Sequence, residues 1–127
     1  MKRKYFVWIS FFAWILFSSS GLAQVNLPED LKKVILVYPG ADTVKVAKND
    51  MGGRHVYDID LQIQGAEYKK VVSFYRNETK KRGWKIFSDV DRGYGYILMC
   101  HDGRYKIDIT VTPKEDKILV RMSILGS

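Results

Sequence analysis

Hydrophobic and polar side chains alternate with a period of two between residues 57 and 64. Tyr57, Ile59, Leu61 and Ile63 share one side of this stretch, and the residues between them are all polar. Such alternation is typical of a strand with one buried face and one face in water. Gly65 follows and is expected to end the strand.

Between Ala66 and Arg82 the period lengthens to that of an α-helix. Side chains that can be buried recur every three or four residues, and Phe74 widens the stripe that they form. The other members of the stripe are Tyr68, Val71, Val72, Tyr75 and Thr79. The pattern predicts a helix over 66–82, with Gly83 as its C-terminal cap. Trp84 is then expected to fold back on the helix end and enter the core.

Shorter alternating stretches predict further strands on both sides of this helix. Before it, residues 43–48 pair with 57–64 through a loop at 49–53. After it, a strand begins at 84–87, a loop is expected at 89–95, and alternating stretches follow at 96–100, 105–112 and 118–124. The proline and acids near the start of 26–36 suit a short helix or a lead-in segment.

The expected order is β-β-α-β-β-β. It describes an α+β domain in which an antiparallel sheet carries one main helix on one face, with a possible short N-terminal helix.

The N-terminus has the three parts of a secretory signal peptide. The basic run 2–4 precedes an uncharged stretch, 5–17, and small residues at Gly21 and Ala23 flank the expected cleavage point. A retained membrane helix needs about 20 apolar residues, which is more than this stretch offers. We therefore expect a signal peptide over 1–23 and a single domain over 24–127 that is periplasmic or secreted and does not span a membrane after cleavage. No cysteine lies near the cleavage point, so a lipid anchor is not indicated.

Cleavage changes how the charge of the chain is interpreted. The full sequence carries a formal charge of +7, and removal of its three N-terminal basic residues leaves +4. A modest positive charge favours anionic surfaces without being a nucleic-acid signature, and no nucleic-acid partner is expected. Cys100 is the single cysteine, which excludes an intramolecular disulfide. Its apolar neighbours predict a buried side chain rather than a reactive thiol.

Three short motifs carry a family resemblance. They are the Tyr38-Pro39-Gly40-Ala41 turn, the Val72-x-Phe74-Tyr75 segment of the helix, and the Gly83-Trp84 pair at its end. Together they resemble a group of small exported bacterial domains, periplasmic or lipoprotein, of unknown function, in which a YPGA turn precedes a hairpin and a V-x-x-F-Y…GW helix precedes a β-meander. The resemblance implies fold and compartment. The chain departs from many members by lacking the lipobox cysteine, and no catalytic residue is carried over.

Few residues suggest chemistry. Asp58 and Asp60 share the polar face of one strand. There they hold a hard cation, divide acid and base roles, or form a solvated face matched by lysines across the sheet. A zinc site would need His55 and His101 to converge with Asp102. No nucleophile elbow, P-loop or dinucleotide fingerprint occurs. We expect no catalytic residue, metal or cofactor.

Two surfaces are candidates for binding. Lys69, Arg76 and Lys80 share one side of the helix, which is either a docking face for lipid headgroups, cell-wall polymer or an acidic partner, or the ordinary solvated back of the helix. The second candidate is the sheet face without a helix. Its expected apolar residues are Tyr94, Phe87, Ile97, Met99, Leu119 and Leu125.

These observations favour a noncatalytic periplasmic binding or scaffold module that uses the open sheet face. Its partner would be a protein or a cell-envelope component. The alternative is a small-molecule or lipid carrier with a cavity between helix and sheet, and a hydrolase based on Asp58 and Asp60 ranks last. The combined candidate binding surface is Lys69, Arg76, Lys80, Phe87, Tyr94, Ile97 and Met99.

Overall fold

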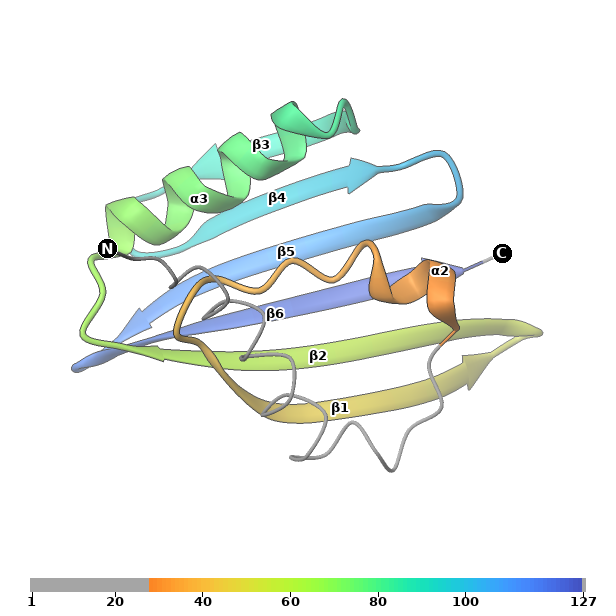
Figure 1. The fold of residues 1–127 in the computed structure, drawn as a ribbon, viewed down its shortest axis with the longest axis horizontal. Coiled ribbons are helices and arrows are strands. Elements are labelled where there is room, and N and C mark those ends of the chain that lie inside the picture. The colour runs from red at the N-terminus through yellow and green to blue at the C-terminus, as the bar shows by residue number, and fades with distance from the viewer. Residues whose placement is uncertain (1–27, 127) are drawn as a thin grey trace, which may run out of the picture.

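The computed structural model describes residues 28–126 of the 127-residue chain. The signal peptide predicted over 1–23 lies outside the described residues and stays a prediction. Two helices and six strands make up the described part (Figure 1). In chain order they are α2 (Glu29–Lys32), β1 (Asp42–Met51), β2 (Arg54–Gln64), α3 (Tyr68–Lys81), β3 (Lys85–Asp91), β4 (Tyr96–His101), β5 (Tyr105–Lys114) and β6 (Lys117–Gly126).

The six strands form one sheet in the order β1-β2-β6-β5-β4-β3, and every neighbouring pair is antiparallel. Helix α3 carries the chain from β2, near one edge, to β3 at the opposite edge. Three hairpin connections then bring the chain back, so that β6 lies between β5 and β2 (Figure 1).

The predicted α+β fold with one main helix is confirmed, and α2 is the short N-terminal helix that was expected. Four strands follow α3, which agrees with the four stretches predicted after the helix, whereas the order β-β-α-β-β-β contains only three. The expected loop at 89–95 is wrong in its first part, because β3 continues to Asp91. The two glycines of 89–95 favoured a loop, whereas in the structure the first residues of this range belong to β3, where groups on α3 bind Asp89 and Asp91.

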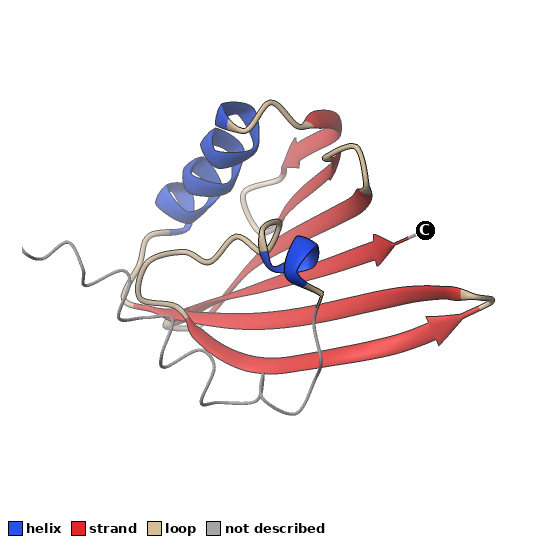
Figure 2. Ribbon diagram, turned by 45° about the vertical axis from the view of Figure 1, so that its right-hand side comes forward, coloured by secondary structure: helices blue, strands red, loops and turns tan. Residues whose placement is uncertain are grey.

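The core lies on one face of the sheet. Alternating residues of β2, β4, β5 and β6 point to this face and are buried, from Tyr57 in β2 to Ile124 in β6. Helix α3 packs on β4 and β5, and the segment 33–41, here called the strap, lies beside α3 on the same face (Figure 2). Among residues 28–126, the buried core residues run from Leu31 to Ile124.

The strap contributes apolar side chains to the core where α3 does not reach. Val34, Ile35 and Leu36 are buried, as is Leu31 at the end of α2. Hydrogen bonds hold its start and its middle. Arg82 donates to the carbonyl of Lys33 at 3.3 Å, and the Tyr75 hydroxyl donates to the carbonyl of Leu36 at 3.0 Å.

The stripe predicted for α3 is its buried side. Val71, Val72, Tyr75 and Thr79 are buried, and Tyr68 and Phe74 pack against the core from its margin. The helix ends in a Schellman motif, in which the N–H groups of Gly83 and Trp84 donate to the carbonyls of Lys80 and Thr79. Gly83 adopts φ +73°, so its role as a cap is confirmed. Trp84 is only partly buried against the core, under the guanidinium of Arg82.

Cys100 is completely buried on β4, as predicted, with its Sγ 3.6 Å from the carbonyl oxygen of Ile107. Burial raises the pKa of its thiol to about 12. The residue is therefore a thiol in the core and not a reactive nucleophile.

Candidate functional site

The strap ends in a tight turn beside the first half of α3. Pro39 and Gly40 occupy the central positions of this turn, and the N–H of Ala41 donates to the carbonyl of Tyr38 at 3.0 Å. Gly40 adopts φ +86°, which a type II turn requires at its third residue, and proline suits the second. The Tyr38-Pro39-Gly40 sequence therefore fixes the direction in which the Tyr38 ring leaves the chain.

Three aromatic rings join the turn to the helix. The rings of Tyr38 and Phe74 meet edge to face with their centroids 5.2 Å apart, and Phe74 meets Tyr75 in the same manner at 5.0 Å. Tyr75 is completely buried, and burial raises the pKa of its hydroxyl, which therefore stays protonated and keeps its hydrogen bond to Leu36. The buried ring of Tyr75 thus supports Phe74, which in turn contacts Tyr38.

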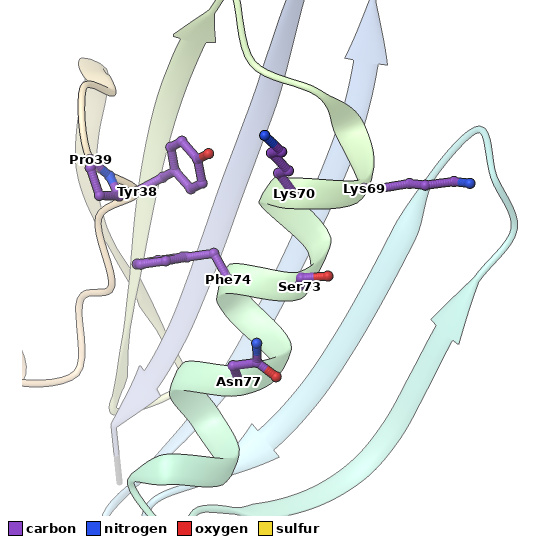
Figure 3. A pocket seen from close by; sticks show the side chains of 7 residues that line it. All are labelled: Tyr38, Pro39, Lys69, Lys70, Ser73, Phe74 and Asn77. Carbon is purple, nitrogen blue, oxygen red and sulfur yellow. The ribbon is translucent and has the colours of Figure 1, made fainter.

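These rings border a surface groove, which we call the Tyr38–Phe74 groove (Figure 3). Its volume is about 440 Å³. A second hollow of about 350 Å³ continues from it past the Gly65-Ala66-Glu67 turn, and the two share Tyr38, Pro39 and Lys70. The groove is lined by Tyr38, Pro39, Lys69, Lys70, Ser73, Phe74 and Asn77. Its size falls within the range of small-ligand sites, about 300–1,000 Å³.

The groove combines an apolar wall with a basic rim. The side chains of Lys70 and Phe74 extend on the side of α3 that faces Tyr38 and Pro39, whereas Lys69 extends on the other side (Figure 3). Both lysines are exposed and lie in the first turn of α3, which contains no acidic residue. The positive end of the helix dipole adds to their charge. An apolar group bearing a negative charge matches this arrangement.

Polar contacts fix α3 against the edge strand β3. Arg76 donates two hydrogen bonds to Asp89, at 2.9 and 2.7 Å, and the hydroxyl of Tyr68 donates to Asp91 at 2.8 Å. The bonds from Arg76 lower the pKa of Asp89 below its usual value. Desolvation, followed by the hydrogen bond to Asp91, raises the pKa of Tyr68 to about 12. This side of α3 is therefore attached to the sheet by hydrogen bonds.

The three basic residues predicted as one helix face have different surroundings. Arg76 is bound to Asp89 and lies over the ring of Tyr96, with its guanidinium carbon 5.2 Å from the centroid. Lys69 lines the groove, and Lys80 is exposed near the end of the helix. The structure therefore does not present them as one continuous binding face.

The six apolar residues expected on the open sheet face are divided into two groups. Phe87, Tyr94 and Ile97 are exposed on β3, on β4 and in the loop between them, and Met99 is half-buried on β4. The remaining two, Leu119 and Leu125, are half-buried on β6. A polar region lies between the groups, because charged and hydroxyl side chains occupy the middle of β2, β6 and β5.

Asp58 and Asp60 belong to this polar region. Asp60 accepts two hydrogen bonds from Arg121, at 2.7 and 3.1 Å, and Asp58 accepts one from Ser123 at 2.6 Å and one from Asn49 at 3.2 Å. Arg121 and Ser123 lie on β6 and Asn49 on β1, so an arginine, a serine and an asparagine take the place of the lysines expected across the sheet. Both carboxylates are engaged in cross-strand contacts.

The histidines also have local partners. The Nδ1 of His55 lies 2.6 Å from a carboxylate oxygen of Asp50, and that of His101 accepts the N–H of Gly103 at 2.8 Å. Residues 28–126 contain no group of three or more His, Cys, Asp and Glu side chains that is arranged to hold a metal ion. Neither helix in that range is long and apolar enough to cross a membrane.

Sequence reasoning found Lys69 and missed the rest of the groove. Tyr38 and Pro39 were identified as a turn and Phe74 as part of the helix stripe, but nothing placed the turn against the helix. An aromatic residue directly before Pro-Gly was the available signal. It becomes informative only when the strap is known to run beside α3.

A family model described as START domain-like matches residues 65–117, a stretch that runs from the start of α3 into β6. The matched part is less than half of the chain, and the similarity is limited to that range. A search of curated proteins finds no match to the chain.

Proposed function

We propose that the protein is an exported, noncatalytic module that binds a small anionic amphiphile in the Tyr38–Phe74 groove. The observation that carries the proposal is the groove itself, an aromatic wall with two lysines at its rim. The similarity to a START domain-like family supports a ligand-binding module. Asp58 and Asp60 both accept hydrogen bonds from neighbouring strands, which favours a binding role over hydrolysis.

The position of the groove refines the carrier alternative. The space between α3 and the sheet is filled by side chains such as Val71, Tyr75 and Ile109, which are completely buried. The two hollows described above lie beside the helix, at the surface. A ligand there keeps one side in water, which suits a molecule with an apolar body and a charged end.

Decanoate is a suitable probe because it has one carboxylate and a short alkyl chain. Fragment 24–127, which retains the whole core, is titrated with decanoate by calorimetry and by amide chemical shifts. Lys70→Met removes the charge and keeps most of the apolar stem. Because a partly exposed ion pair contributes up to about 1 kcal/mol, the dissociation constant should rise about fivefold.

Lys81→Met is the matched control, since Lys81 is an exposed lysine at the other end of the same helix. It should leave the dissociation constant unchanged. Decanol, which lacks the charge, should bind the unmodified fragment more weakly than decanoate and should not distinguish Lys70→Met from it. Equal effects of the two lysine variants, or shifts confined to residues away from the groove, would rule out the proposal.

A further inference from the structure

The exposed large hydrophobic side chains gather at one place on the sheet. Of the residues that the structure describes, five large hydrophobic side chains are exposed, and four of them belong to β3, β4 and the loop between them. These four, Phe87, Val90, Tyr94 and Ile97, are called the hairpin surface. Their exposed fractions are 58, 41, 70 and 43%, respectively.

Strand register places Val90 and Ile97 of the hairpin surface on the face opposite α3. Val90 and Ile97 are direct cross-strand partners, and Ile97 lies next to Thr110 of β5 on the polar face of that strand. The register of β3 shifts between Ile86 and Ser88, so Phe87 occupies an irregularity in the strand. Tyr94 lies in the hairpin loop, which the hydrogen bond from the N–H of Arg92 to the carbonyl of Gly95 closes at 2.9 Å.

The acids of this hairpin face the other way. Asp89 and Asp91 pair in register with Leu98 and Tyr96, which are completely buried on the side of α3. Asp89 binds Arg76, and Asp91 accepts hydrogen bonds from Tyr68 and from the N–H of Gly93. Asp89 is therefore paired with a cation, and both carboxylates are held on the helix side, away from an anion that approaches the open face.

The charges left beside the hairpin surface are positive. Lys85 is exposed, with its ammonium 5.4 Å from the centroid of the Phe87 ring, and Arg92 is exposed in the hairpin loop next to Tyr94. The nearest acid of β5 on the open face is Asp108, opposite Met99, and the ammonium of Lys106 lies 3.9 Å from its carboxylate. Apolar and aromatic groups with cations at their margin complement a surface that is apolar inside and anionic outside.

We infer that the hairpin surface docks on an anionic lipid bilayer. Phe87, Val90 and Ile97 enter the boundary between headgroups and acyl chains, and Tyr94 lies at headgroup level, where its ring is apolar and its hydroxyl is hydrated. Lys85 and Arg92 bind lipid phosphates. Both hollows described above are lined by other residues. The protruding side chains of the hairpin surface suit a soft, adaptable partner.

The test measures flotation of fragment 24–127 with vesicles of phosphatidylcholine alone or mixed with phosphatidylglycerol. Binding is expected with the anionic vesicles at low salt and is expected to fall as salt is added. The double variant Phe87→Ser, Tyr94→Ser should lower the partition coefficient at least tenfold, because two exposed aromatic side chains no longer enter the membrane. Lys85→Glu should lower it about fivefold or more.

The opposite edge of the sheet supplies matched controls. Val44 on β1 is 59% exposed, almost the same fraction as Phe87, and Lys48 is an exposed lysine on the same strand. Val44→Ser and Lys48→Glu should leave the partition coefficient unchanged. Circular dichroism verifies that every variant is folded.

Three outcomes would overturn the inference. The first is an absence of flotation with anionic vesicles at low salt, and the second is an equal loss of flotation in the β1 controls. The third is a dimer in sedimentation that Phe87→Ser dissociates, since the hairpin surface would then bind a second copy of the chain. Decanoate binding by the groove is independent of all three.

Discussion

The hydrogen bond between Tyr75 and Leu36 allows the attachment of the strap to be tested with a change of one oxygen atom. Tyr75→Phe keeps the buried ring and its edge-to-face contact with Phe74. It removes the hydroxyl that donates to the Leu36 carbonyl at 3.0 Å. The substitution therefore removes the bond by which α3 holds the middle of the strap.

The expected cost follows from what remains after the change. A neutral hydrogen bond contributes about 1 kcal/mol net, and a buried acceptor left without a donor raises the loss to about 1–3 kcal/mol. Leu36 is 3% exposed, so water reaches its carbonyl poorly. We expect the free energy of unfolding to fall by about 2 kcal/mol. For a folded unit of this size, that corresponds to a decrease in Tm on the order of 10 °C.

Urea unfolding followed by circular dichroism measures the loss, and the dependence of the free energy on urea should keep its slope. Hydrogen exchange shows where stability is lost. Amides of the strap should exchange faster, and the exchange rates of amides in the middle of β5 should rise less. Thr79→Val is the matched control. Thr79 is also completely buried, but its hydroxyl donates only to carbonyls of its own helix, those of Tyr75 and Arg76.

The carbonyls that Thr79 contacts lie within α3, so the control should cost about 0.5 kcal/mol. The reasoning is refuted if Tyr75→Phe costs no more than Thr79→Val. It is also refuted if the strap amides keep their protection while the protein as a whole loses stability.

Two further predictions concern the ends of α3 and β3. Because Arg76 lowers the folded-state pKa of Asp89, their pairing stabilises the fold above the unfolded pKa of about 3.9 and is lost as the pH falls through that value toward the folded pKa. Asp89→Asn should therefore lower the free energy of unfolding at pH 7 by roughly 1 kcal/mol, a value that allows for the partial exposure of the pair. The free energy of unfolding of the variant should also fall less steeply below pH ~4. Urea unfolding at several pH values would contradict this if the variant lost stability in acid as steeply as the unmodified protein. Gly83→Ala should cost about 1–2 kcal/mol in thermal unfolding, because φ at this position is +73°. Gly95→Ala should cost less, since Gly95 lies outside the left-handed region and its nearest neighbour is at 4.0 Å.

The elements with a strong local period could be predicted from the sequence. In strand β2 and in helix α3, buried residues recur at a regular spacing along the whole element. Gly83 marks the end of α3 by a local signal that requires no knowledge of distant residues. The end of β3 could not be predicted in the same way. Asp89 belongs to a strand because Arg76, thirteen residues earlier, neutralises it there.

The groove and the divided sheet face depend on tertiary arrangement. Tyr38 and Phe74 are far apart in sequence and meet only because the strap runs beside α3. On the open face, alternation correctly identified outward residues but could not give their order across the sheet. Arg121 of β6 lies between Asp60 of β2 and Thr110 of β5, so a polar region separates the apolar residues of β6 from those of β3 and β4.

The position of β6 has a consequence for how the chain reaches this fold. Strand β6, which follows the other five in the chain, is an interior strand of the sheet, bordered by β2 on one side and β5 on the other. Until residues 117–126 have left the ribosome, β2 has only its hairpin partner β1, and an isolated hairpin is marginally stable in water. A nascent chain is therefore unable to complete the sheet early, and folding must wait for a pairing that spans some sixty residues of sequence. Such a chain keeps β2 without its second neighbour, and the sheet incomplete, until β6 has been made.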